Sequence, residues 1–139
     1  MDLQVGVKII IYDGAGNIFL IKRSSKKYGK IANQWDPVGG RIEAGTPLLE
    51  NLKREIKEEL GISLKIKAPT LIAAQDIIRK DYHVVRLTYK GITDGLKKKI
   101  KLNDEIVDHR WFSIRELEQL PNNELDEFVR KLLNKGLLF

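Results

Sequence analysis

Residues 39–62 of the 139-residue chain read GGRIEAGTPLLENLKREIKEELGI, and this stretch holds the clearest structural signal in the sequence. It predicts a helix over residues 46–60, because Thr46 suits an N-cap, Pro47 suits the first helical position and Gly61 is a natural C-terminal stop. One face of this helix is apolar, and we expect it to pack against a core. That face carries Leu49, Leu52, Ile56 and Leu60.

Three glutamates crowd another side of the same predicted helix. Glu55, Glu58 and Glu59 stand at positions i, i+3 and i+4, which are neighbours on a helix surface. Counted at roughly 100° per residue, Glu59 lies about 40° from the centre of the apolar arc, at the edge of the core. An unpaired carboxylate is costly there, so it needs a cation or hydrogen-bond donors. The alternative is an ordinary acidic solvated face, and the position of Glu59 argues against it.

The remaining pattern mixes strands with helices. Strands are predicted at residues 3–12, 18–21, 63–78, 82–92 and 106–112, and a final helix at 124–134. Ser113 and Glu116 form a capping box that opens a short helix before Pro121. We therefore expect residues 1–139 to form a single domain of α/β or α+β class, with a mixed sheet sandwiched between helices.

Composition narrows the function classes. Cysteine is absent, which excludes disulfides, thiolate metal sites and cysteine nucleophiles. The net charge of +6 favours anionic ligands, although a lysine-rich solvated surface is the alternative. The apolar run at residues 5–12 is too short to span a membrane and lacks the layout of a signal peptide. We expect a cytoplasmic protein without a membrane partner.

The quoted stretch resembles the Nudix box, G-x5-E-x7-R-E-U-x-E-E-x-G-U, where U is an apolar residue. The matching residues, all in register, are Gly40, Arg54, Glu55, Ile56, Glu58, Glu59, Gly61 and Ile62. Outside the box, the Trp35 approach to the glycines and the late pair Trp111 and Phe112 are similar too. One position departs, because Thr46 stands where the family has its first box glutamate. We interpret this change as tolerated.

The resemblance implies a Nudix-type fold and a magnesium-dependent hydrolase, with Mn²⁺ as a substitute ion. The implied metal ligands are the Gly39 carbonyl and the carboxylates of Glu55, Glu58, Glu59 and Glu105. Arg54 would orient Glu55. The general base would be Glu55, which we favour, or Glu105, whose alternative role is a solvated loop charge.

The implied reaction is water attack on a phosphoanhydride bond of a nucleoside diphosphate-linked substrate. Nucleoside triphosphates, nucleotide sugars and dinucleoside polyphosphates all fit that description. Candidate substrate contacts are Arg23 and Gly40 near phosphate, Tyr28 stacked on a base, and Asn122 at a base edge. Each has a plainer interpretation: a surface arginine, a turn glycine, a loop aromatic and a loop-tip asparagine.

Other functions remain as alternatives. A Nudix protein that processes RNA ends or binds RNA is the runner-up, although the basic run Lys97, Lys98, Lys99 and Lys101 lacks interleaved aromatics and suits a solvated edge. A catalytically silent Nudix-fold binding module is another, and the clustered glutamates argue against it. An isopentenyl-diphosphate isomerase is excluded because that enzyme relies on a cysteine. We expect a small nucleotide partner rather than nucleic acid, and a homodimer is left open.

Overall fold

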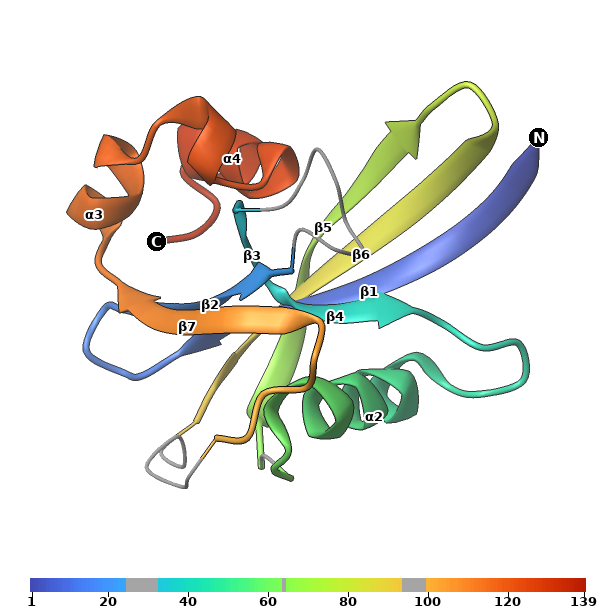
Figure 1. Ribbon diagram of the computed structural model, residues 1–139, viewed down its shortest axis with the longest axis horizontal. Helices are drawn as coiled ribbons and strands as arrows, with labels where there is room; N and C mark the ends of the chain where they lie inside the picture. The colour runs from blue at the N-terminus through green and yellow to red at the C-terminus, as the bar shows by residue number, and fades with distance from the viewer. Residues whose placement is uncertain (25–32, 64, 94–99) are drawn as a thin grey trace.

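The computed structural model describes residues 1–24, 33–63, 65–93 and 100–139 (Figure 1). The strands are β1 (Asp2–Tyr12), β2 (Ile18–Arg23), β3 (Trp35–Asp36), β4 (Val38–Arg41), β5 (Lys67–Ile78), β6 (Tyr82–Ile92) and β7 (Ile106–Phe112). The helices are α2 (Leu48–Leu60), α3 (Ile114–Gln119), the 3₁₀ turn η2 (Asn122–Glu124) and α4 (Glu127–Asn134). Within these ranges no helix has the length and apolar character needed to cross a bilayer.

The strands form one mixed seven-stranded sheet in the part of the chain described. Its order is β3-β2-β1-β6-β5, with β4 paired to β1 and β7 paired to β2. The strands predicted at residues 3–12 and 18–21 are confirmed as β1 and β2, and they pair antiparallel as a hairpin around the turn at residues 13–17. β1 also runs parallel to β6 along its whole length, and this pairing makes the sheet mixed.

Helices cover both faces of the sheet, as the sequence predicted: α2 lies on one face, and α3 with α4 on the other (Figure 1). Alternate residues of β1 serve the two layers, because successive strand side chains point to opposite faces. Val7, Ile9 and Ile11 pack with Leu52, Ile56 and Leu60 of α2 in one buried cluster. Ile10 belongs to the second cluster, together with Leu117, Val129 and Leu132 from α3 and α4.

The start of α2 corrects two expectations. The N-cap is Pro47, without a side-chain cap, so the prediction that Thr46 caps the helix is wrong. The buried Asn51 instead holds the loop before the helix: its Nδ2 donates to the Thr46 and Pro47 carbonyls at 2.8 and 3.1 Å, and its Oδ1 accepts from the Glu43 amide at 2.9 Å. Leu49 is 39 % exposed, so its predicted place in the core is wrong as well. Its angle suits the apolar arc, but it lies in the first turn of the helix and is left exposed there.

Several other boundaries also differ from the sequence prediction. β5 begins at Lys67 rather than residue 63, and residues 35–41 form two short strands rather than a simple approach to a turn. α4 begins at Glu127 because Asp126 caps it, accepting hydrogen bonds from the Phe128 and Val129 amides. The Ser113 capping box is confirmed, with both of its reciprocal hydrogen bonds present.

The contrast between the two leucines of α2 gives a stability test. We expect Leu52→Ala to lower the free energy of unfolding by about 2–5 kcal/mol, because it empties a buried position. Leu49→Ala should change it by less than about 0.5 kcal/mol, as an exposed substitution does. Urea denaturation of both variants measures the difference. Equal losses in the free energy of unfolding would contradict the assignment of Leu52 to the core and of Leu49 to the surface.

Candidate active site

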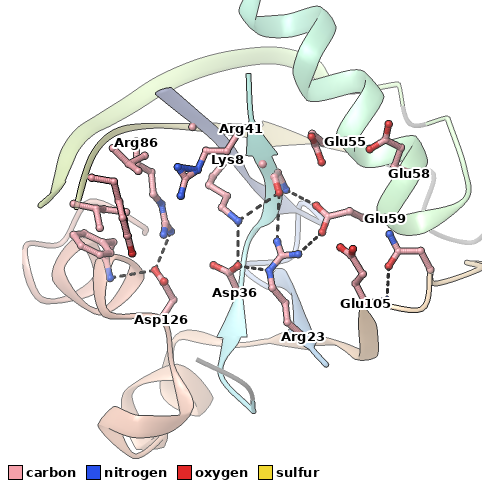
Figure 2. Close-up of a pocket in the computed structure, with 18 of the residues that line it drawn as sticks. Lys8, Arg23, Asp36, Arg41, Glu55, Glu58, Glu59, Arg86, Glu105 and Asp126 are labelled. Carbon is pink, nitrogen blue, oxygen red and sulfur yellow. Dashed lines mark hydrogen bonds and ion pairs between the residues drawn. The ribbon is translucent and has the colours of Figure 1, made fainter. Parts of the chain in front are cut away.

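A cavity of about 840 Å³ opens between α2, the centre of the sheet and the start of α4 (Figure 2). Glu55, Glu58, Glu59 and Glu105 lie at one end, and Arg86 and Asp126 at the other. Lys8, Arg23 and Asp36 lie between them. The fold thus brings all four glutamates singled out in the sequence to one cavity, together with charged residues from β1, β2, β3 and β6.

Glu59 is the most enclosed of these carboxylates, with 4 % of its surface exposed. Its Oε1 accepts from the Gly39 backbone amide at 2.8 Å, and its Oε2 accepts from Arg23 Nη1 at 2.6 Å. The expectation that a carboxylate here needs a cation or hydrogen-bond donors is therefore confirmed, and the residue has both.

Gly39 and Gly40 both lie close to neighbouring atoms. Gly39 has a φ of 142°, and a Cβ there would lie 2.1 Å from the Val7 carbonyl oxygen. A Cβ on Gly40 would lie 2.8 Å from the carboxylate atoms of Glu55. A side chain at position 40 would therefore displace the Glu55 carboxylate from its present place.

Glu55 is half-buried, and its ionisation is opposed by its surroundings. Burial raises the pKa of the Glu55 carboxyl, and the neighbouring charges of Glu59 and Glu58 raise it further, while Arg54 lowers it. Arg54 Nη2 lies 3.3 Å from Glu55 Oε1. Its Nη1 lies 3.1 Å from Glu43 Oε1 and 3.5 Å from Glu58 Oε1. Arg54 thus contacts the carboxylate that the sequence predicted it would orient.

Lys8, Arg23 and Asp36 form a charged floor. Asp36 Oδ2 accepts from Lys8 Nζ at 3.1 Å and from Arg23 Nε at 2.8 Å. Burial alone would raise the pKa of Asp36, but Lys8 and Arg23 outweigh it and hold that pKa well below its usual range. Burial lowers the pKa of the Lys8 ammonium, and Asp36 opposes that shift. Both cations also face the Gly39 carbonyl oxygen, at 3.5 Å from Lys8 and 3.3 Å from Arg23.

The other candidates fall in different places. Glu105 lines the cavity just before β7, where its backbone carbonyl accepts from the Ser24 amide at 2.6 Å. Asn122 is exposed on η2 and is not among the described residues that line the cavity. Tyr28, like Lys97, Lys98 and Lys99, lies outside the described residues.

Sequence reasoning missed several charged residues of the cavity, among them Lys8, Asp36, Arg86 and Asp126. A signal existed for Lys8, the one charged residue within the apolar run at 5–11. Arg86 is a second charge inside an apolar strand. Asp36 and Asp126 gave no such signal, because the sequence around each of them resembles that of an ordinary loop.

The donor set suits a hard divalent cation, because it consists of carboxylate and carbonyl oxygens. Crowding also favours one: the raised pKa of Glu55 arises from burial and from two neighbouring carboxylates. Among the described side chains, no three acidic or histidine groups converge into a ready cage. Both Glu59 oxygens already accept hydrogen bonds. A cation here would therefore draw on Glu55, Glu58 and Glu105 and on oxygens of a bound ligand.

Comparison with known proteins adds the family. A model of the NUDIX domain matches residues 2–133. The nucleoside triphosphatase NudI of Escherichia coli is 31 % identical over 140 residues, which cover 94 % of both chains. The MutT NUDIX hydrolase of Burkholderia pseudomallei superposes with a TM-score of 0.78 at 28 % identity, covering 96 % of this chain and 98 % of that one. The MutT protein of Methanosarcina mazei Go1 gives 0.79 at 21 % identity, covering 96 % and 91 %.

The charged floor can be tested through stability. We expect Asp36→Asn to lower the free energy of unfolding by about 3 kcal/mol, because it leaves two buried cations without their shared carboxylate. Since the pKa of Asp36 is depressed in the fold, its stabilisation is present above the ordinary aspartate pKa of about 4 and is lost as the pH falls.

The measurement is denaturant unfolding of the parent and the variant across pH. The gap between them should stay constant above about pH 5 and narrow below about pH 4. Asp81→Asn, an exposed aspartate in the turn before β6, is the control and should match the parent. A gap that widens towards acid would contradict the assignment.

Proposed function

Since the chain belongs to the Nudix family, we propose that it is an enzyme that hydrolyses a phosphoanhydride bond of a nucleoside triphosphate with the help of Mg²⁺. The observation that carries this proposal is the shared cavity, in which glutamates of α2 and Glu105 face Lys8 and Arg23. The name of the Escherichia coli relative, a nucleoside triphosphatase, supports the substrate class.

In this proposal the glutamates of the cavity bind the metal ion, and the cations Lys8 and Arg23 bind the phosphates. Glu55, Glu58 and Glu105 would hold the divalent ion, Mg²⁺ or Mn²⁺, while Glu59 and the Gly39 carbonyl, which the sequence also named as ligands, lie beside them and already accept hydrogen bonds. Bound there, the ion neutralises phosphate charge and makes water a better nucleophile. Lys8 and Arg23 place positive charge next to the phosphates at this position, and Gly40 leaves room for them.

Glu55 is the proposed general base. A base works best when its pKa lies near the working pH, and burial beside Glu58 and Glu59 shifts the pKa of Glu55 in that direction. Arg54 holds the Glu55 carboxylate in place from the same helix. Glu105, which also lines the cavity, is the alternative base. No protein nucleophile takes part, because water attacks phosphorus directly and a phosphate group leaves.

Dependence on a divalent ion is the first test. A panel of nucleoside triphosphates, nucleotide sugars, dinucleoside polyphosphates and capped RNA is assayed for released phosphate or pyrophosphate. We expect hydrolysis of at least one nucleoside triphosphate with Mg²⁺, no turnover in excess chelator, and recovery on adding Mg²⁺ or Mn²⁺. Full turnover in excess chelator would contradict the metal mechanism. A preference for capped RNA over the other substrates would favour RNA-end processing.

A matched pair of glutamates on α2 tests the assigned roles. We expect Glu58→Gln to lower kcat by about two orders of magnitude or more, the scale of losing an electrostatic contributor. The fold should hold, because the Glu58 side chain is 54 % exposed. Glu50→Gln makes the same change on the outer face, where Glu50 is 59 % exposed and does not line the cavity.

Melting curves accompany the kinetics of both variants. Glu50→Gln should retain the parent kcat. A folded Glu58→Gln enzyme with the parent rate would remove Glu58 from the metal site and would strengthen the case for a binding module without catalysis.

A further inference from the structure

We propose that a second copy of this chain pairs antiparallel with the outer edge of β5, so that two sheets become continuous across a two-fold axis at Ile77. This inference is separate from the proposed function, because it concerns the surface through which the chain associates with itself. β5 ends the strand order β3-β2-β1-β6-β5 and pairs with β6 alone among the strands described. The end of β5 and the start of β6 project past the helices (Figure 1).

The backbone of β5 offers hydrogen-bonding groups on its outer side. The Arg79 amide donates to the Tyr82 carbonyl at 2.9 Å, so these two residues form a hydrogen-bonded pair of the β5–β6 hairpin. Hydrogen-bonded and non-hydrogen-bonded pairs alternate along an antiparallel ladder, and the register is regular from Ala74 to Ile78. The N–H and C=O groups of Ala74, Asp76 and Ile78 therefore point away from β6.

These outward groups have almost no partner within the described part of the chain. One side chain reaches them: Arg79 Nη1 donates to the Ile78 carbonyl at 3.1 Å. The Arg79 side chain is 50 % exposed, so it can move aside for a backbone donor. A row of backbone groups left in this state is a template for another strand.

The same segment lacks the features that protect an edge strand. Proteins that stay monomeric use short edge strands, proline or charged side chains there. Residues 71–78 read LIAAQDII, without proline or lysine. Their one charge, Asp76, lies 2.6 Å from His83 Nε2 of the same sheet. The opposite edge strand, β7, is shorter and carries the polar run DHR at residues 108–110.

Charge complementarity selects the second copy as the partner and fixes the register. An axis at Asp76 would set two carboxylates directly opposite each other, which is destabilising. An axis at Gln75 would leave the two aspartates diagonal to each other. An axis at Ile77 places Asp76 opposite Ile78 of the second copy and diagonal to its Lys80, within reach of a long side chain. Asp76 and Lys80 are both exposed, so each copy supplies both charges.

This register also covers apolar surface on both sides of the axis. Ile78, which is 57 % exposed, packs beside the strand of the second copy. Ile77 meets its own copy in a non-hydrogen-bonded pair, where side chains come closest. The plainer alternative is an edge that stays in water, since scattered apolar side chains are ordinary on surfaces. The two differ in the mass of the particle in solution.

Sedimentation equilibrium from micromolar to millimolar protein measures that mass. We expect the parent to rise from the 16.0 kDa of one chain towards twice that value as its concentration increases. A parent that keeps the mass of one chain over the whole range overturns the inference. Because this measurement uses no substrate, its outcome is independent of whether the chain hydrolyses a nucleoside triphosphate.

Charge at position 74 tests the register, because an axis at Ile77 sets Ala74 opposite Lys80 of the second copy. We expect Ala74→Lys to raise the dissociation constant of the dimer about tenfold, since symmetry introduces the like-charge pair twice. Ala74→Glu pairs opposite charges and should bind as tightly as the parent or more tightly. Val107→Lys is the matched control on β7, where Val107 is 57 % exposed, and should keep the parent constant. No weakening by Ala74→Lys overturns the edge, and equal weakening by Ala74→Glu overturns the register.

A cross-link tests the axis directly, because the chain contains no cysteine. Ile77→Cys introduces a single thiol, and the Cα atoms of a non-hydrogen-bonded pair lie about 4.5 Å apart, within the range of a disulfide. We expect oxidation to convert folded Ile77→Cys protein into a covalent dimer, while Val107→Cys stays as single chains. Melting curves establish that each variant is folded. A folded Ile77→Cys protein that forms no more covalent dimer than Val107→Cys overturns the axis at Ile77.

Discussion

The carboxylate of Glu59 is the point on which the site depends. It is buried, and it joins three elements, because it accepts from the Gly39 amide of β4 and from Arg23 of β2 while its own backbone belongs to α2. Burying a charge without partners would cost several kcal/mol. The helix can therefore dock only where a backbone amide and a guanidinium meet it. That docking sets Glu55 and Glu58 along the same cavity wall.

The central position of β1 orders the rest of the cavity. Because β1 pairs with β4 on one side and β6 on the other, Lys8 lies between the glycines of β4 and the Arg86 strand. Charges alternate across this space, from the glutamates to the cations, to Asp36, and to the Arg86 and Asp126 pair. A polyanionic ligand fits such an arrangement with its negative charges over the cations of the floor.

The sequence predicts well what is local and periodic. The helix at α2, the hairpin, the capping box at Ser113 and the burial of Glu59 all follow from spacing along a few turns or strands. Thr46 and Leu49 were misjudged because the end of a helix is decided by its surroundings: the helix has Pro47 as its N-cap, and Leu49 is left exposed in the first turn. Lys8 and Asp36 meet across 28 residues, and Arg86 meets Asp126 across two elements, so spacing does not reveal either pair.

The hydrogen bonds of Asn51 bear on position 46, where the sequence departs from the Nudix box. The loop before α2 is held through its backbone, since the Thr46 carbonyl accepts from Asn51 and the Thr46 amide donates to the Glu43 carbonyl at 3.2 Å. The Thr46 side chain makes no hydrogen bond within the described part of the chain. The hydrogen bonds that hold this loop therefore do not depend on the side chain at position 46.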